Sequence, residues 1–226
     1  MVLHRVLVLI ASLDEEEGIG YTLTELSQVL EDPLLFVVDG NSTDRTVQIA
    51  KESGAEILIQ KGKGKGNAIS QAISNIDGDI EYVILIDADF TYPAENLPEM
   101  IQILETNPNV GMVCGNRFNS HFNLGEMHNL LYFGNRLLAF MHNLLNGIKM
   151  HDPLTGLRAI RWNTIKGWKP KSKSFDLEVE LNHQVERKGY NIIEIPIRYR
   201  PRLGKKKLKV KHGFTILKRI LVESLL

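Results

Sequence analysis

The sequence predicts an α/β fold built on a mostly parallel sheet, and two observations lead to that prediction. In the first half of the chain, short apolar runs of strand length alternate with segments whose apolar residues recur at helical spacing. Such alternation is typical of β-α-β units, in which each helix returns the chain to a parallel strand. Two of the apolar runs end in acidic residues, at the sheet edge where α/β proteins bind ligands.

The expected elements follow one another closely, as about half of a doubly wound sheet. Buried strands are expected at Val6–Ala11, Leu34–Val38, Glu56–Ile59 and Tyr82–Ile86. Helices are expected at Glu15–Leu30, Asp44–Ser53, Asn67–Ile76, His128–Ile148 and Phe175–Val185. Ser42 or Thr43 is expected to cap the second helix and Gly54 to stop it.

Composition excludes several classes of protein. The 226 residues are 43% hydrophobic with zero formal net charge, which is typical of a globular protein and argues against nucleic-acid binding. A single cysteine, Cys114, excludes an internal disulfide and favours a reducing compartment. The first residues do not resemble a secretory leader, and no apolar stretch reaches the roughly 18 residues of a membrane span. We expect one domain, residues 1–204, and an appendage, residues 205–226.

The stretch Asp87-Ala88-Asp89 is the principal candidate site. It directly follows the expected strand Tyr82–Ile86, so alternation along a strand would turn both carboxylates to the same side. Paired carboxylates suit a hard divalent cation such as Mg²⁺ or Mn²⁺. The alternative is that the two acids only end the strand and open a turn.

Two further stretches are expected at the same edge. Asp39 ends a strand and can accept hydrogen bonds from a base or ribose, while Asp44 either binds ligand or complements the helix dipole. The loop Lys61–Gly66 is cationic and opens a helix, which suits a diphosphate held by backbone N–H groups. Taken alone, its lysines are better explained as solvated side chains.

Five motifs together resemble a known family. Asp39–Asp44, Gly64–Gly66, Asp87–Asp89, Gly115–Phe118 and Asp152–Gly156 occur in the order and approximate spacing of family-two inverting glycosyltransferases with the GT-A fold. The chain is most similar to the polyprenol-phosphate sugar transferases of the dolichol-phosphate mannosyltransferase type, from Val6 to about Leu208. The resemblance implies a Rossmann-like, mostly parallel mixed sheet flanked by helices.

The resemblance implies how a nucleotide-sugar donor is held. The residues it assigns to the base, ribose, diphosphate and sugar are Ala11, Asp14, Glu15, Asp39, Lys65, Asp87, Ala88, Asp152, Glu178 and Glu180. The first strand end departs from the family pattern, since Ala11–Glu15 replaces the usual Pro-x-Tyr-Asn-Glu. The donor is expected to be GDP-mannose or UDP-glucose, with mannose favoured on the resemblance.

The resemblance also implies a metal and an acceptor site. Asp89 would bind Mg or Mn on the donor diphosphate, with Thr91 in the place of the family's glutamine and His151 as a further candidate ligand. Positive residues would meet the acceptor phosphate or close over both substrates, namely Arg117, Arg136, Arg202 and Lys207. His128 and Tyr132 stand where the family has arginine and serine.

The expected reaction follows from the acceptor. A phosphate monoester has its second pKa at about 6, so near neutral pH it attacks without a general base. Hexose transfer from the nucleotide-sugar to a polyprenyl or dolichyl phosphate would proceed by in-line displacement with inversion. The alternatives are a family-two glycosyltransferase with a soluble acceptor, such as a sugar or phosphoglycerate, and a non-catalytic nucleotide-sugar binding protein.

Two segments bear on the membrane. An apolar stripe runs along His128–Ile148, which packing in the core explains more readily than contact with lipid. The tail Lys205–Leu226 joins a lysine cluster to an amphipathic helix. A basic patch before such a helix fits peripheral attachment to the cytoplasmic face of a membrane, although the protein could equally stay in the cytoplasm. Docking of the tail on the sheet and a dimer contact are the alternatives.

Overall fold

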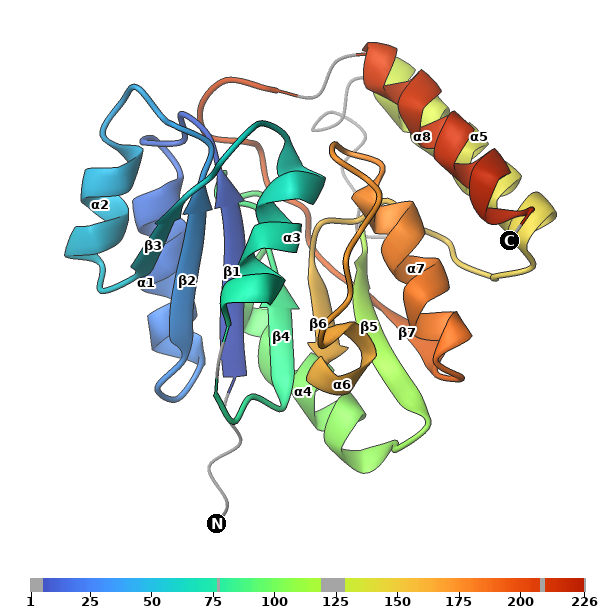
Figure 1. Cartoon of the computed structure of the whole chain (residues 1–226), viewed down its shortest axis with the longest axis horizontal. Helices are drawn as coiled ribbons and strands as arrows, with labels where there is room; N and C mark the ends of the chain where they lie inside the picture. The colour runs from blue at the N-terminus through green and yellow to red at the C-terminus, as the bar shows by residue number, and fades with distance from the viewer. Residues whose placement is uncertain (1–5, 77, 119–128, 208–209, 226) are drawn as a thin grey trace.

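The computed structural model describes residues 6–76, 78–118, 129–207 and 210–225. A seven-stranded sheet runs through the middle of the molecule, and helices cover both of its faces (Figure 1). The strands are β1 Val6–Ser12, β2 Leu34–Asp39, β3 Glu56–Ile59, β4 Tyr82–Leu85, β5 Val110–Asn116, β6 Arg158–Arg161 and β7 Asn191–Pro196. The helices are α1 Ile19–Val29, α2 Thr46–Glu52, α3 Lys65–Asn75, α4 Leu97–Thr106, α5 Asn129–Asn146, α6 Trp162–Ile165, α7 Leu177–Arg187 and α8 Val210–Glu223, with a 3₁₀ turn η1 at Ala94–Asn96.

The sheet is mixed and mostly parallel, in the order β3-β2-β1-β4-β6-β5-β7. The first four strands are parallel to one another, as the alternating pattern predicts. Strand β6 is inserted antiparallel between β4 and β5, and β5 pairs in parallel with β7. The expected α/β fold is therefore confirmed, and β5, β6 and β7 complete the sheet beyond the four strands expected from the sequence.

Each face of the sheet has its own apolar core. On one face, α1, α2 and α4 pack through residues such as Leu23, Ala50 and Met100. On the other face, α3, α6 and α7 pack through residues such as Ile69 and Leu181. All four residues of β4 are buried, because a central strand of a doubly covered sheet meets apolar side chains on both sides.

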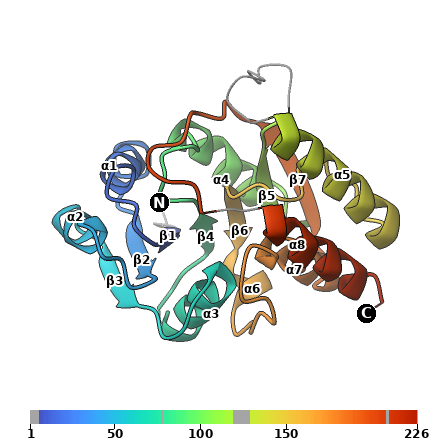
Figure 2. The ribbon, with the colours of Figure 1, turned by 90° about the horizontal axis from the view of Figure 1, so that it is seen from above.

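Helices α5 and α8 lie side by side beyond the β5–β7 end of the sheet (Figures 1 and 2). The inner face of α8 packs Ile216 and Ile220 in one cluster with Val179 of α7 and with Leu138 and Leu145 of α5. The tail helix thus rests on two helices and not directly on the sheet. In the described part of the chain, no helix combines the length and apolar character that crossing a membrane requires.

The carboxyl ends of β1, β2 and β4 meet at one edge of the sheet. The segment between β7 and α8 returns across this edge, above β1 and β4 (Figure 2). Two backbone hydrogen bonds fasten it there, from Arg200 N–H to Thr91 O at 2.9 Å and from Leu203 N–H to Asp89 O at 3.1 Å. The basic sequence after β7 is therefore brought onto the acidic turn after β4.

Candidate active site

The acidic turn Asp87–Asp89 lies just beyond β4, which ends at Leu85. The sequence argument, that alternation along a strand turns both carboxylates to the same side, is therefore wrong, since neither acid is in the strand. Phe90 has a φ of +64°, so the backbone turns sharply directly after Asp89. The two acids nevertheless interact, because burial and the neighbouring charge of Asp87 raise the pKa of Asp89.

Lys65 is the partner of Asp87. Its ammonium nitrogen lies 2.7 Å from Asp87 Oδ1 and 2.8 Å from Glu178 Oε1, so it bridges the acidic turn and helix α7. Burial opposes the charge on both groups, but their attraction prevails, lowering the pKa of Asp87 and raising that of Lys65. Lys65 begins α3, so the glycine-rich loop places this lysine at the helix start that the sequence predicted.

Asp89 is held from two directions. The backbone N–H and the hydroxyl of Thr91 donate to its Oδ1, at 3.2 and 2.6 Å. Arg202 donates to its Oδ2, and the other arm of the same guanidinium donates to Glu15. Lys207 also reaches Glu15, at 3.0 Å. The structure thus brings together Asp89, Glu15, Arg202 and Lys207, which lie far apart in the sequence.

The donor atoms beside Asp89 fit a hard divalent cation. Burial raises the pKa of Glu15, and its Oε2 is buried without a hydrogen-bond partner among the described residues. Carboxylate oxygens are the ligands that Mg²⁺ and Mn²⁺ prefer. The described residues contain no group of three acidic, histidine or cysteine side chains placed to hold a metal ion. The guanidinium of Arg202 donates a hydrogen bond to the Asp89 carboxylate. A cation bound here would therefore replace the guanidinium.

Asp39 organises the turn that follows β2. It is fully buried and accepts hydrogen bonds from the Ser42 N–H at 2.8 Å and from the Ser12 hydroxyl at 3.1 Å. The exposed Asp14 accepts from the Thr43 N–H at 2.7 Å, which ties the end of β1 to the same turn. In this structure the carboxylate of Asp39 thus braces the loop, and Ala11 at the end of β1 is partly exposed beside it.

The cap expected for the second helix is wrong. Ser42 donates to Asp39 and Thr43 to Asp14, so neither residue caps α2. Arg45 is the N-cap residue, and Asp44, just before it, accepts the Thr46 N–H with its Oδ1 at 2.9 Å. Such hydrogen bonds outweigh burial and lower the pKa of Asp44. Of the two interpretations of Asp44, the structure favours the local, structural one.

Arg117 forms a buried pair with Asp152. Its Nε and Nη2 donate to the two carboxylate oxygens, each at 2.7 Å, and Asp152 is fully buried. The guanidinium also lies 5.7 Å from the ring centre of Phe118, and Arg136 of α5 lies 5.6 Å from the same ring. Two arginines expected at the acceptor phosphate therefore flank one aromatic ring. His128 lies outside the described residues.

The loop Asp152–Gly156 packs against the acidic turn. A Cβ added to Gly156 would lie 2.5 Å from Asp87 Oδ2, and the Gly156 N–H donates to the Tyr92 hydroxyl at 2.7 Å. At the other end of the loop, His151 Nδ1 lies 3.0 Å from Glu194 of β7. The described contacts of His151 lead to Glu194, so this conformation does not bring it to Asp89.

Glu178 and Glu180 have different surroundings although both lie in the first turn of α7. Glu178 reaches Lys65, as described above. The two oxygens of Glu180 accept the backbone N–H groups of Lys171 and Ser172, at 2.8 and 2.6 Å. Glu178 therefore belongs to the acidic cluster, whereas Glu180 holds the loop that precedes α7.

Lys206 is an exposed side chain of the lysine run. Burial, together with the positive charges of Arg202 and Arg117, lowers its pKa. The positive charges of Arg202 and Arg117 therefore add to that of Lys206 on this side of the acidic turn. The lysine cluster alone could not show that Lys207 turns inward to Glu15 while Lys205 and Lys206 stay exposed.

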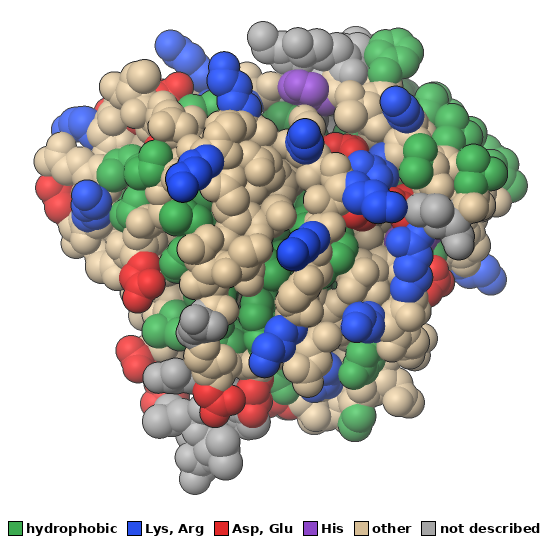
Figure 3. All heavy atoms as spheres, in the orientation of Figure 1, with side chains coloured by type: hydrophobic (Ala, Val, Ile, Leu, Met, Phe, Trp, Pro, Cys, Tyr) green, Lys and Arg blue, Asp and Glu red, His purple; other side chains and the backbone are tan. Residues whose placement is uncertain are grey.

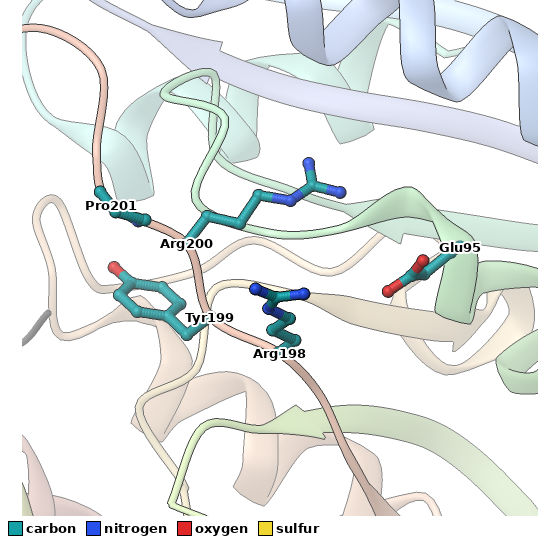
Figure 4. Close-up of a pocket in the computed structure, with 5 residues that line it drawn as sticks. All are labelled: Glu95, Arg198, Tyr199, Arg200 and Pro201. Atoms are coloured by element: carbon teal, nitrogen blue, oxygen red, sulfur yellow. The ribbon is translucent and has the colours of Figure 1, made fainter. Parts of the chain in front are cut away.

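A shallow hollow of about 320 Å³ lies on the same returning segment, lined by Glu95, Arg198, Tyr199, Arg200 and Pro201 (Figure 4). Figure 4 shows the Arg198 guanidinium between Tyr199 and Glu95. Arg200 is bound by Glu25 at 2.6 and 2.8 Å. The arginines of the segment thus contact different residues: Arg200 binds Glu25, and Arg202 reaches the acidic turn.

Taken together, an Asp-x-Asp turn at the carboxyl edge of a mostly parallel sheet, with lysine and arginine side chains bound to its acids, defines a GT-A glycosyltransferase. Comparison with known proteins agrees. The chain belongs to glycosyl transferase family 2, whose model matches residues 7–166. It is therefore an enzyme of the glycosyltransferase class.

Named relatives cover nearly the whole chain. A dolichyl-phosphate hexose transferase of Haloferax volcanii is 32% identical over 203 residues, which is 89% of this chain and 85% of the relative. An undecaprenyl-phosphate mannosyltransferase of Micrococcus luteus is 24% identical over 218 residues, or 90% and 87% of the two chains.

A solved structure confirms the fold. Glucosyl-3-phosphoglycerate synthase of Mycobacterium tuberculosis, crystallised with Mn²⁺, UDP-glucose and phosphoglyceric acid, is similar at a TM-score of 0.77. The match covers 99% of this chain and 81% of that chain at 18% identity. A likeness at this level of identity establishes the GT-A fold and leaves substrates open.

Proposed function

We propose that this protein transfers a hexose from a nucleotide-sugar to a polyprenyl phosphate at a membrane surface, with inversion at the anomeric carbon. Mannose from GDP-mannose is the favoured donor group and glucose from UDP-glucose the alternative. The relatives named for dolichyl and undecaprenyl phosphate support the acceptor class. The mannose preference rests on the family resemblance.

The observation that carries the proposal is the ring of cations around the acidic turn. Lys65 lies on the Asp87 side and Arg202 and Lys207 on the Asp89 side, while Arg117 pairs with Asp152 of the loop that packs against the turn. A nucleotide diphosphate and an acceptor phosphate together bring several negative charges to one site. Lysine and arginine side chains bind phosphate through charge-assisted hydrogen bonds. The cluster therefore matches a reaction between two phosphate-bearing substrates.

The transfer itself needs little proton chemistry. An oxygen of the acceptor phosphate forms the new bond to the anomeric carbon, while the bond from that carbon to the donor diphosphate breaks. The bonding electron pair leaves with the nucleoside diphosphate, and an α-linked donor yields a β-linked product. Since the acceptor is mostly ionised near neutral pH, Arg117, Arg202 and Lys206 would orient it and balance its charge.

Asp89 and Glu15 are the residues that would hold a divalent cation, which, when bound, would supply positive charge to the departing diphosphate. Arg202, once displaced from Asp89, would be free to turn toward substrate phosphate. In this account Lys65 keeps Asp87 ionised and fixed, so the acidic turn stays in place when Arg202 moves.

A lipid-bound acceptor is supported by the outer face of α5 and α8. Large apolar side chains point to solvent there, with Phe133 and Phe214 69% and 75% exposed, and Figure 3 shows such side chains gathered over these helices. The same face includes Leu137, Phe140, Leu144, Leu221, Val222 and Leu225. Its exposed charged residues, among the side chains described for the two helices, are Arg136 and Lys218. Apolar side chains bordered by positive charge fit an anionic bilayer surface.

The test is a transfer assay with purified full-length protein, Mn²⁺ or Mg²⁺, and a short-chain polyprenyl phosphate in mild detergent. Radiolabelled GDP-mannose and UDP-glucose are compared as donors, and Asp89→Asn is the catalytic control. Label that enters the lipid fraction with wild type and is lost with the control supports the proposal. Binding of a donor without any lipid-linked product in either reaction would overturn it.

A soluble acceptor is the second candidate, because the solved structure with the same fold binds phosphoglyceric acid. The cation cluster around Arg117 and Arg202 would suit a small phosphorylated acceptor as well. Replacing the lipid phosphate by 3-phosphoglycerate in the same assay separates the two. Product in the aqueous phase with no lipid present would favour this candidate.

A further inference from the structure

Arg219 of α8 lies at the centre of an ion-pair network that no step above uses. Its Nε lies 3.0 Å from Asp176 Oδ2, and its Nη1 lies 3.7 Å from Glu180 Oε2 and 3.4 Å from Glu223 Oε1. The side chain is 13% exposed. The guanidinium of Arg219 thus pairs with two carboxylates at the start of α7 and with one carboxylate of α8.

The two α7 carboxylates hold the loop that precedes this helix, Lys171–Ser174, here called the brace loop. Glu180 accepts the N–H groups of Lys171 and Ser172, as described for the site. Asp176 Oδ1 accepts the Ser172 hydroxyl at 2.6 Å, while its Oδ2 accepts from Arg219. Asp176 therefore connects the tail helix directly to the brace loop.

The brace loop in turn presses on the first residues of α3. A Cβ added to Gly64 would lie 2.0 Å from the Lys173 carbonyl oxygen, and one added to Gly66 would lie 2.4 Å from the Ser172 carbonyl oxygen. Both contacts are with backbone carbonyl groups, so there is no room for a side chain between the brace loop and the start of α3. Between these two glycines lies Lys65, the bridge to Asp87 and Glu178.

We propose that Arg219 is a positioning residue for the nucleoside-diphosphate end of the active site. It acts through Asp176, Glu180 and the brace loop on Gly64–Gly66, and so fixes the helix start that binds the diphosphate. The inference rests on the proposed nucleotide-sugar donor, and it adds that the tail helix contributes to donor binding without touching the donor. The same helix carries part of the outer apolar face, so surface attachment and donor binding share one element.

The physical reason is charge balance in a buried place. Without Arg219, Asp176 and Glu180 lose the cation between them, and two nearby carboxylates repel each other. The repulsion is relieved when one side chain moves, and each holds the brace loop through short hydrogen bonds. The displacement therefore reaches Gly64–Gly66, while the apolar contacts of Ile216 and Ile220 still hold α8 in place.

The chain offers a matched control in Arg187. It also joins α7 to α8, through Glu223 at 2.6 Å, but its described ion pair does not include Asp176 or Glu180, and it reaches the brace loop only indirectly, through Glu223 and Arg219. Arg219→Met and Arg187→Met each remove one guanidinium between the same two helices. A merely structural role for Arg219 would make the two variants alike.

The experiment measures binding of GDP and UDP by calorimetry with saturating Mn²⁺, together with hydrogen exchange of residues 61–66 and 171–174. Arg219→Met is expected to weaken binding of the preferred nucleotide roughly 3- to 10-fold and to speed exchange in both segments. Arg187→Met is expected to keep wild-type affinity despite a similar loss of thermal stability. Arg219→Lys, which keeps the charge, should recover part of the affinity.

Ser172→Ala tests the same path from the loop side, should Arg219→Met fail to fold. It removes the hydroxyl bond to Asp176 and should weaken nucleotide binding in the same direction. Equal affinity of wild type, Arg219→Met and Ser172→Ala, or an equal loss with Arg187→Met, would overturn the inference. These readouts need no acceptor, so a failure to make lipid-linked product would count against the proposed function alone.

Discussion

Arg202 donates to the carboxylate of Asp89 across 113 residues of sequence, and its other arm donates to Glu15. A guanidinium thus stands where the chemistry of the acids suits a divalent cation. Its Nε and Glu15 Oε2 are both buried without a hydrogen-bond partner in the described part of the chain. Arg202 and Glu15 are therefore satisfied only in part, and a cation can compete with the guanidinium for the two carboxylates.

Removing Arg202 is expected to tighten metal binding while it lowers turnover. In Arg202→Met, Asp89 loses its competing partner, and Mn²⁺ should bind the nucleotide-free protein about tenfold more tightly. Turnover should fall because the same residue would orient substrate phosphate. Manganese titration by electron paramagnetic resonance measures the affinity. Arg200→Met is the control, since Arg200 pairs with Glu25, and unchanged Mn²⁺ affinity in Arg202→Met would contradict the competition.

Lys65 should matter for stability as well as for donor binding. In Lys65→Met, the buried Glu178 and the Asp87 carboxylate, which is one-third exposed, lose their shared cation, and we expect a cost of roughly 1–3 kcal/mol. Urea unfolding measures the loss, and nucleotide affinity should fall with it. Lys63 is an exposed lysine of the same loop, so Lys63→Met should unfold like wild type. Equal behaviour of the two variants would mean that the bridge contributes nothing.

A methyl group at position 66 should disturb the donor loop. Gly66→Ala would place a Cβ 2.4 Å from the Ser172 carbonyl oxygen, so the brace loop must shift. We expect a loss of about 1–3 kcal/mol in unfolding free energy and weaker nucleotide binding. Gly134→Ala in α5 meets nothing within 4 Å and should be neutral or stabilising by about 0.5–1 kcal/mol. A stable, tightly binding Gly66→Ala protein would refute the contact.

Acid should destabilise the packing of α5 against α7. Burial lowers the pKa of His142 to about 4, and burial lowers that of its neighbour His183 to about 4 as well. The unfolded chain takes up these protons near pH 6.5, so between pH 6.5 and 4 it binds more protons than the folded protein. Unfolding free energy should therefore fall as the pH drops through this window.

For His142 alone the expected loss is about 1.6 kcal/mol between pH 6.5 and pH 5. Urea midpoints at these two pH values measure it, with His142→Gln as the comparison because glutamine does not titrate. The variant should lose less stability on acidification than wild type. If both proteins lose the same amount, His142 does not carry the effect.

The outer face of α5 and α8 should govern binding to lipid vesicles. Replacing Phe140 and Leu144, which are 59% and 65% exposed, by serine should weaken sedimentation with anionic vesicles about tenfold or more. Turnover with a short-chain acceptor in detergent should change little, because neither residue contacts the acidic turn. A double variant that still binds vesicles like wild type would contradict this use of the face.

The first half of the fold could be predicted because its strands and helices are local patterns. The four runs that alternate with helices became β1 to β4, and the predicted boundaries differ by only a few residues. Strand β6 was not foreseen, since Arg158–Arg161 is short and begins and ends with arginine. Its antiparallel place between β4 and β5 depends on pairing between distant segments, which local patterns do not encode.

In the site, too, local motifs could be recognised in the sequence, whereas contacts between distant residues could not. Motifs indicated Asp87, Asp89, Lys65, Glu178 and Arg202, and the structure brings these residues to one edge. The partner of each could not be predicted, because Arg117 with Asp152 and Arg202 with Asp89 are contacts across long stretches of sequence. Spacing alone also could not separate Glu178 from Glu180, whose different roles come from the brace loop.

The most direct test of the central claim is a competition for acceptor. Wild-type protein is given its preferred labelled donor with equal amounts of a short-chain polyprenyl phosphate and 3-phosphoglycerate. Phase separation assigns the label, and nuclear magnetic resonance of the product gives its anomeric configuration. The account predicts label in the lipid phase as a β-linked sugar phosphate, absent with Asp89→Asn. Label confined to the aqueous phase, or a product that retains the donor's α configuration, would contradict it.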